Sequence, residues 1–244
     1  MRSRVDVLGI LIDKVNKREA LEKIENFISS EGSKIVVTPN AEMIVRSQKD
    51  SRLKEIINSA QLVLPDGAGV VIASRLLNKS LEERVSGIDI VQELLNRGSK
   101  KGYSFYFLGG KPGVAQKAKE EALNRYPNLD INFHHGYLDR QLEKKVVEEI
   151  KVSKVDILLV GMGVPLQEKW LDKHLSFLGV PVGIGVGGSF DILSGEKRRA
   201  PQMVQKLNLE WLYRLAQEPS RAGRMVSLPK FIHQVLKQKI NRIK

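Results

Sequence analysis

Up to about residue 194, the sequence alternates short apolar runs with longer amphipathic stretches. Most runs are apolar at successive positions, as strands buried on both faces are. The amphipathic stretches repeat apolar residues three and four positions apart, which is typical of a helix with one buried face; an example is Leu53, Ile56, Ile57 and Ala60. This alternation predicts an α/β fold, with a Rossmann-like, largely parallel sheet flanked by helices.

The same pattern predicts where the elements lie. Strands are expected at residues 5–11, 34–38, 62–64, 104–108, 130–133, 155–160 and 182–186. Helices are expected at residues 17–29, 41–60, 68–77, 88–97, 114–125, 140–151 and 166–177. In open α/β sheets, ligands bind outside the carboxyl ends of the strands, so the residues after each strand are the first candidates for chemistry.

The pattern changes after Gly195, where helical stretches follow one another without intervening strands. We therefore predict an α/β catalytic domain over residues 1–195 and a helical appendage over residues 196–244. In the predicted helix 202–217, apolar residues fall four apart, so this helix is expected to dock on an apolar surface. These residues are Met203, Leu207, Trp211 and Leu215.

Positive charge is concentrated in the appendage. Of the net charge of +12, residues 196–244 contribute +9, from 12 Lys and Arg against 3 Asp and Glu. The predicted helix 229–244 has an apolar face and a basic face, which suits the headgroup boundary of an anionic membrane. It also suits a helix packed on the body with its basic face in water. The concentration of charge favours the membrane.

Composition narrows the classes of protein. The chain has no cysteine, which excludes disulfides and cysteine nucleophiles and fits an intracellular location. The N-terminus lacks the apolar run of a secretory signal. No apolar stretch approaches the ~20 residues that span a bilayer. We expect a cytoplasmic protein that is peripherally associated with the inner face of the cell membrane.

Polar residues follow several predicted strands or begin the next helix. Thr38 and Asn40 follow one strand, although Asn40 also suits a helix N-cap. Asp66 follows another, where a carboxylate can serve as a general base, although Pro-Asp-Gly is also a turn signature. Arg84 precedes a predicted helix N-terminus, a good place for phosphate; a surface ion pair with Glu82 or Glu83 is the ordinary alternative.

Three glycine turns also follow strands. Gly109 and Gly110 lie in the first of them, and Gly187 lies in the third. Each lets a backbone approach a ligand closely, but none has a complete dinucleotide or P-loop spacing. Gln167, Glu168 and Asp191 begin the helices after two of these turns, where helix capping is the ordinary role of the carboxylates.

Metal chemistry has little support in the sequence. His134 and His135 are adjacent, His174 and His233 are isolated, and there is no Asp-x-Asp motif. No cofactor is expected, and a nucleotide diphosphate would be bound by helix N-termini and arginines.

Six motifs in fixed order resemble the WecG/TagA/CpsF family, glycosyltransferase family 26. They are Thr38-Pro-Asn40, Leu64-Pro-Asp66-Gly-Ala-Gly, Arg84-Val-Ser-Gly-Ile-Asp89, Gly161-Met-Gly-Val-Pro-Leu-Gln167-Glu-Lys-Trp170, Gly187-Gly-Ser-Phe-Asp191 and Arg198-Arg-Ala-Pro. The resemblance covers nearly the whole chain.

The resemblance implies a reaction. The segment from Leu209 to Pro219 is most similar to family members that act in wall teichoic acid synthesis. Such members transfer N-acetylmannosamine from UDP-N-acetylmannosamine to the 4-hydroxyl of N-acetylglucosamine on undecaprenyl diphosphate, with inversion and without a metal. Another UDP-hexose donor, for a different surface polysaccharide, remains an alternative.

The resemblance also implies roles for residues. Asp66 matches the proposed base, Arg84 a motif arginine, and Thr38, Asn40 and Gln167 pocket-lining polar residues. If the appendage folds over the pocket, further arginines can bind the lipid diphosphate, or else lipid headgroups. These are Arg214, Arg221 and Arg224.

Two other classes of protein are open to test. A basic nucleic-acid-binding protein predicts aromatic residues interleaved with arginines on one face, but the appendage has only Trp211, Tyr213 and Phe231. A nucleotide-dependent oxidoreductase predicts a dinucleotide fingerprint, which the glycine turns lack. We expect no nucleic-acid partner, and the sequence leaves a homo-oligomer open.

Overall fold

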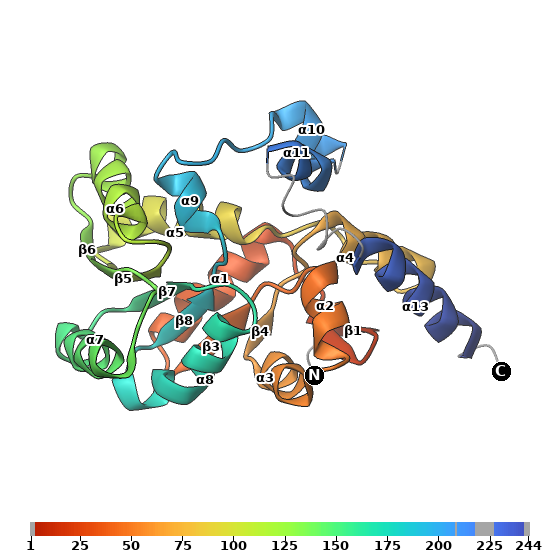
Figure 1. The fold of residues 1–244 in the computed structure, drawn as a ribbon, viewed down its shortest axis with the longest axis horizontal. Coiled ribbons are helices and arrows are strands. Elements are labelled where there is room, and N and C mark those ends of the chain that lie inside the picture. The colour runs from red at the N-terminus through yellow and green to blue at the C-terminus, as the bar shows by residue number, and fades with distance from the viewer. Residues whose placement is uncertain (1–2, 208, 218–226, 242–244) are drawn as a thin grey trace.

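The computed structural model describes residues 3–207, 209–217 and 227–241 (Figure 1). The strands are β1 (Arg4–Val7), β2 (Ile10–Asp13), β3 (Lys34–Val37), β4 (Leu62–Val63), β5 (Ser104–Gly109), β6 (Asp130–His134), β7 (Ile157–Gly161) and β8 (Val182–Gly185). Within the described residues, β3 to β8 form a six-stranded sheet in the order β4-β3-β8-β7-β5-β6. Every neighbouring pair in this sheet is parallel.

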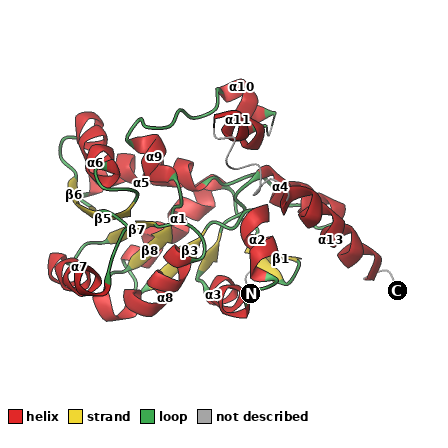
Figure 2. Cartoon of the chain, in the orientation of Figure 1, coloured by secondary structure: helices red, strands yellow, loops and turns green. Residues whose placement is uncertain are grey.

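Helices cover both faces of the sheet (Figure 2). They are α1 (Lys17–Ile28), α2 (Ala41–Ser47), α3 (Ser51–Ser59), α4 (Ala68–Leu76), α5 (Gly87–Lys101), α6 (Val114–Arg125), α7 (Arg140–Ser153), α8 (Leu166–Leu178), α9 (Ser189–Leu193), α10 (Gln202–Lys206), α11 (Glu210–Gln217) and α13 (Ser227–Asn241). The predicted α/β class with a parallel sheet is confirmed.

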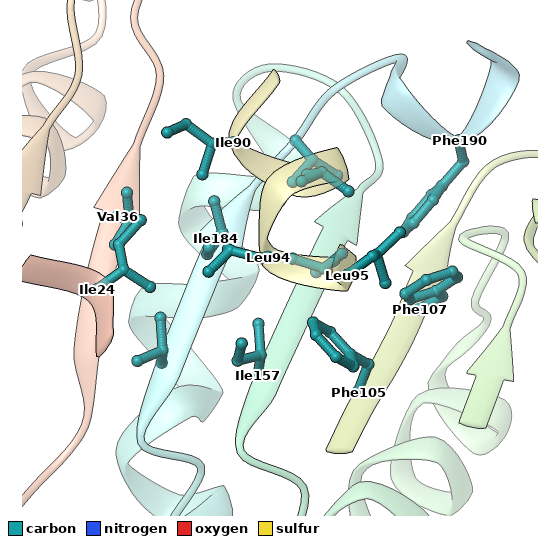
Figure 3. Packing of buried hydrophobic residues seen from close by; sticks show 14 of the residues in the cluster. Ile24, Val36, Ile90, Leu94, Leu95, Phe105, Phe107, Ile157, Ile184 and Phe190 are labelled. Atoms are coloured by element: carbon teal, nitrogen blue, oxygen red, sulfur yellow. The ribbon is translucent and has the colours of Figure 1, made fainter. Parts of the chain in front are cut away.

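Alternating residues of each central strand pack into different layers. Phe105 and Phe107 of β5 lie in a core with α1, α5, α6 and α9, which Figure 3 shows from close by. Tyr106 and Leu108 of the same strand lie in a second core with α7 and α8. Because both faces of the strands are buried, their sequence is apolar at successive positions.

The predicted strand 5–11 is wrong, because β1 and β2 form an antiparallel hairpin outside the main sheet. The two-residue turn is Leu8-Gly9, with φ values of 54° and 77°, and a primed turn of this kind matches the twist of a hairpin. The Asp6 Oδ1 atom accepts the Gly9 N–H at 2.7 Å and holds the turn. The turn was not recognised in the sequence because its first residue is a leucine, which rarely adopts a positive φ.

The predicted helix 41–60 is two helices. Asp50 begins the second one, since its side chain accepts the Leu53 N–H at 3.0 Å as an N-cap. The predicted helix 202–217 is likewise divided into α10 and α11. The break removes the shared apolar face: Met203 is 77% and Leu207 65% exposed, so the expected docking of this part is wrong.

Helix α13 packs alongside α2 and α4 (Figure 1). Phe231 and Val235 are fully buried in a core that also contains the hairpin. The Gln238 Oε1 atom accepts the Leu8 N–H at 2.9 Å. On the other side of α13, Leu236 and Ile240 are exposed. No helix in the described part of the chain is long and apolar enough to cross a membrane.

Candidate active site

A pocket of about 210 Å³ lies where the loops after β3 and β4 meet the start of α5 and helix α11. Its polar lining includes Asn40, Asp66, Arg84, Ser86 and Glu210. Apolar side chains also line the pocket, and they are those of Ile72, Trp211, Leu215 and Leu228. The carboxyl edge of the sheet thus carries a cavity that is lined by carboxylates, a guanidinium and hydrocarbon side chains.

Asp66 is held at the edge of the sheet by the turn that follows β4. The Leu64 N–H donates to the Val37 carbonyl at 2.9 Å, which extends the strand pairing, and the Asp66 N–H donates back to the Leu64 carbonyl at 2.9 Å. The Oδ2 atom of Asp66 accepts the N–H of Gly87, the first residue of α5, at 3.3 Å. A helix N-terminus favours negative charge, so the start of α5 is a suitable neighbour for this carboxylate, which lines the pocket.

Thr38 lies next to the contact between Asp66 and Gly87. Its hydroxyl donates to the Gly185 carbonyl at 3.0 Å and joins the ends of β3 and β8. A Cβ atom at Gly87 would come within 3.3 Å of the Thr38 methyl group and 3.7 Å of the Asp66 Oδ2 atom. Glycine at this position lets the start of α5 approach both side chains.

Asn40 has two roles that the sequence offered as alternatives. Its side chain accepts the Met43 N–H at 2.9 Å and is the N-cap of α2. The same residue lines the pocket beside Asp66. Capping therefore places Asn40 at the pocket wall.

Arg84 pairs with a residue far away in the sequence. Its Nη2 atom lies 2.6 Å from the Oε2 atom of Glu210, and both side chains are largely buried. Glu83 instead accepts the Lys17 N–H, and Glu82 lies near Asn16. The alternative of a local surface pair with Glu82 or Glu83 is wrong.

Gln167 links two of the glycine turns by hydrogen bonds. Its Oε1 atom accepts the N–H groups of Gly163 at 3.2 Å and Gly187 at 3.0 Å, so it joins the loops after β7 and β8. Its Nε2 atom donates to the Glu168 Oε1 atom at 2.7 Å. Gln167 is buried and lies along the same edge of the sheet, but not in the wall of the Asp66 pocket. A substrate contact by Gln167 stays a prediction.

Glu168 is a buried carboxylate rather than an exposed helix cap. Within the described part of the chain, its Oε2 atom has no hydrogen-bond partner. Burial raises the pKa of Glu168 to about 7, although the hydrogen bond from Gln167 opposes the shift. Glu168 therefore holds its proton in the folded protein at pH values where the unfolded chain has released it.

We expect Glu168→Gln to change how stability depends on pH. The folded-state pKa is raised, so between about pH 4.5 and pH 7 the unfolded chain has lost the proton that the folded protein keeps. The stability of the wild type therefore falls as the pH rises through this range. The amide cannot ionise, so the variant lacks this loss. Its unfolding free energy minus that of the wild type should therefore be larger at pH 8 than at pH 5, by up to ~3 kcal/mol. Urea unfolding of both proteins at the two pH values measures this gain, and an equal difference at both would contradict it.

The other predicted site residues have structural contacts of their own. A Cβ atom at Gly109 would lie 2.5 Å from the Gly161 carbonyl oxygen, so glycine is required for β5 to meet β7 there. Asp191 pairs with Lys197 at 2.5 Å. Gly110 and Gly187 lie at the same edge, and substrate contacts by all four residues stay predictions. Of the appendage arginines, the side chain of Arg214 and all of Arg221 and Arg224 lie outside the described residues.

In the ranges that the structure describes, no group of three or more His, Cys, Asp or Glu side chains is arranged to hold a metal ion. Among the described residues that line the pocket, the cation is the guanidinium of Arg84. An arginine beside the N-terminus of α5 is a suitable binding site for a diphosphate.

Comparison with known proteins identifies the family. Residues 5–244 match the model of the glycosyl transferase WecG/TagA/CpsF family. The chain belongs to the WecG/TagA/CpsF family. It is therefore a glycosyltransferase. Its Rossmann-like sheet and the pocket beside Asp66 are the scaffold and candidate site of a WecG/TagA/CpsF enzyme.

Similar proteins from Staphylococcus aureus carry a more specific name. The relatives from strains MW2 and NCTC 8325 / PS 47 are each 35% identical over 239 residues, which cover 97% of this chain and 94% of each relative. Both are named N-acetylglucosaminyldiphosphoundecaprenol N-acetyl-beta-D-mannosaminyltransferase.

Sequence reasoning did not find several residues of the pocket lining, among them Glu210 and Trp211. Glu210 is one of only three acidic residues in the strongly basic segment 196–244, which is a signal that could have marked it. Trp211 was assigned to an apolar stripe of a long helix. Because that helix is broken, α11 brings both residues to the pocket of the family's predicted base, Asp66.

Proposed function

We propose that this enzyme transfers N-acetylmannosamine from UDP-N-acetylmannosamine to the 4-hydroxyl of N-acetylglucosamine-diphospho-undecaprenol, in the synthesis of the wall teichoic acid linkage unit. The observation that carries the proposal is that Asp66 and Arg84 line the same pocket at the carboxyl edge of the sheet. The printed names of the Staphylococcus aureus relatives support this donor sugar and this acceptor.

The proposed mechanism is a single displacement with inversion and without a metal. Ionised Asp66 takes the proton of the acceptor hydroxyl as its oxygen attacks the anomeric carbon and the bond to UDP breaks. Negative charge develops on the leaving diphosphate. Arg84 and the N-terminus of α5 can stabilise that charge more in the transition state than in the ground state.

The apolar surroundings of the pocket support a lipid-linked acceptor. Trp211 and Leu228 line the pocket and also an adjoining groove of about 520 Å³ between α11 and α13. The groove is otherwise lined by Pro229, Ile232, His233 and Leu236. A cavity that is polar at the reacting end and apolar beyond it suits a sugar diphosphate joined to a polyprenyl chain.

The exposed side chains of the appendage support peripheral attachment to an anionic membrane. Leu236 and Ile240 of α13 are exposed, and so is the basic side chain of Lys237 between them. Leu212 of α11 is also exposed. Apolar side chains beside lysines can enter the headgroup region while the lysines meet anionic lipid.

A donor and acceptor panel tests the proposed function. The purified protein is incubated with UDP-N-acetylmannosamine, UDP-N-acetylglucosamine and other UDP-hexoses, together with a short-chain N-acetylglucosamine diphospholipid, with and without EDTA. Mass spectrometry of the product should show one N-acetylhexosamine added from UDP-N-acetylmannosamine, with turnover unaffected by EDTA. Transfer from another donor alone would assign the enzyme to a different surface polysaccharide.

A further inference from the structure

Helix α11 brings a carboxylate into the wall of the candidate active site. Glu210, its first residue, lies next to Arg84 although the two are 126 positions apart in the sequence. The Arg84 Nη2 atom donates to the Glu210 Oε2 atom at 2.6 Å. The exposed fractions of the two side chains are 15% for Arg84 and 7% for Glu210. This ion pair joins the predicted appendage to the body at the pocket itself.

The burial of the pair determines its effect. Exposed ion pairs restrain their side chains little, because water and salt compete for both charges. When one partner of a buried pair is removed, the other charge is left without compensation, and it must move or recruit another partner. Glu210 therefore holds the guanidinium of Arg84 in one orientation.

The pairing leaves Arg84 able to bind a second anion. A guanidinium has five N–H donors in a planar fork, and the bond to Glu210 is made by an Nη2 donor. Arg199 differs, because its Nη1 and Nη2 atoms both contact the carboxylate of Asp89, at 2.6 and 2.8 Å. Two of its nitrogens are thus held by one carboxylate of α5. Arg84 is the arginine of the two that lines the pocket.

Arg199, Asp89, Glu210 and Asp66 are charged side chains of one cluster. Burial opposes ionisation of Arg199, but its bonds with Asp89 and the negative charges of Asp89, Glu210 and Asp66 raise its pKa. Glu210 and Asp66 therefore lie close enough to act on the same cation. A shift of α11 would change the environment of both Arg84 and the predicted base.

We propose that Glu210 is a positioning residue, which aims Arg84 at the diphosphate of the nucleotide donor and makes that orientation depend on the docking of α11. The inference rests on the proposed function, in which the diphosphate is the leaving group. Glu210 acts through Arg84 and takes no part in proton transfer.

A double-mutant cycle tests the inference. Glu210→Ala, Arg84→Ala and the double variant are compared with wild type for kcat, KM and the affinity for UDP, measured by calorimetry. Glu210→Ala should lower kcat/KM by about 10- to 100-fold, the effect of one charge-assisted hydrogen bond. In the Arg84→Ala background, the same change should have an effect below about threefold, because its target is gone.

Control variants separate positioning from folding. Glu196→Ala removes another acidic side chain of the same segment, one in an exposed ion pair with Lys117, and should leave kcat/KM unchanged. Glu210→Gln preserves the shape of the side chain and should retain part of the activity. Additive losses in the cycle would overturn the inference, and so would a gain in UDP affinity on Glu210→Ala, which would mean that Glu210 blocks Arg84.

The UDP measurement distinguishes this inference from the proposed function. If the wild type does not transfer N-acetylmannosamine, the proposed function fails. The cycle can still be measured with UDP alone, where non-additive weakening by Glu210→Ala and Arg84→Ala supports the positioning role. Equal UDP affinity for all four proteins would overturn it.

Discussion

Asp66→Asn is expected to reduce sugar transfer by about 10²- to 10⁴-fold, the usual contribution of a general base. The amide has almost the shape of the carboxylate but cannot accept the proton of the acceptor hydroxyl. Its oxygen can still accept the Gly87 N–H, so the turn after β4 and the start of α5 should keep their positions. The kcat for transfer and the affinity for UDP are measured side by side, and only the former should fall.

A matched control is Asp139→Asn. Asp139 is the N-cap of α7 on the body of the protein, and asparagine caps a helix as well as aspartate does. This variant should have wild-type turnover. Turnover of Asp66→Asn within a few fold of wild type would remove Asp66 from the role of base. A loss of UDP binding along with turnover would mean that Asp66 holds the donor.

Patterns that report burial predicted the fold well. Strands β5 and β7 are apolar at successive positions because both of their faces are buried. One set of side chains packs on α5 and α6, and the other packs on α7 and α8. The hairpin and the break between α2 and α3 were missed because they depend on single residues. Leu8 adopts a positive φ that leucine rarely has, and Asp50 caps a helix inside an amphipathic repeat.

Which candidate residues lie together was predictable where position along a strand determines it. Asp66, Thr38 and Asn40 follow the adjacent strands β4 and β3, so the strand order alone brings them together. The partner of Arg84 was not predictable in this way, because it depends on where α11 packs after the chain has left the sheet. The sequence offered Glu82 and Glu83, which are close in the chain but face other residues.

Glu168 shows a similar limit. A carboxylate at a helix start ordinarily stabilises the helix dipole from the surface. Here the preceding Gln167 turns inward to accept the two glycine N–H groups, and Glu168 is buried with it. Which face of the first turn of α8 is buried depends on how the glycine loops pack, and spacing in the sequence does not contain that information.

The two faces of α13 should respond differently to substitution. Phe231→Ala is expected to lower the free energy of unfolding by about 3–5 kcal/mol, because it empties a fully buried site between α2, α4 and the hairpin. The double variant Leu236→Ala/Ile240→Ala changes apolar side chains of similar size that are 42% and 57% exposed, and its effect on stability should be below about 1 kcal/mol. Urea unfolding measures both.

Vesicle binding should give the opposite ranking. Leu236→Ala/Ile240→Ala removes apolar groups from the surface proposed to enter the membrane, so partition onto anionic vesicles should fall by about tenfold or more. Under conditions where it remains folded, Phe231→Ala keeps those groups, and its partition should stay within a few fold of wild type. If Phe231→Ala left the unfolding free energy unchanged, α13 would be a detachable appendage, as the predicted boundary after residue 195 has it. A large loss would instead make α13 part of the catalytic domain, with only its outer face available to lipid.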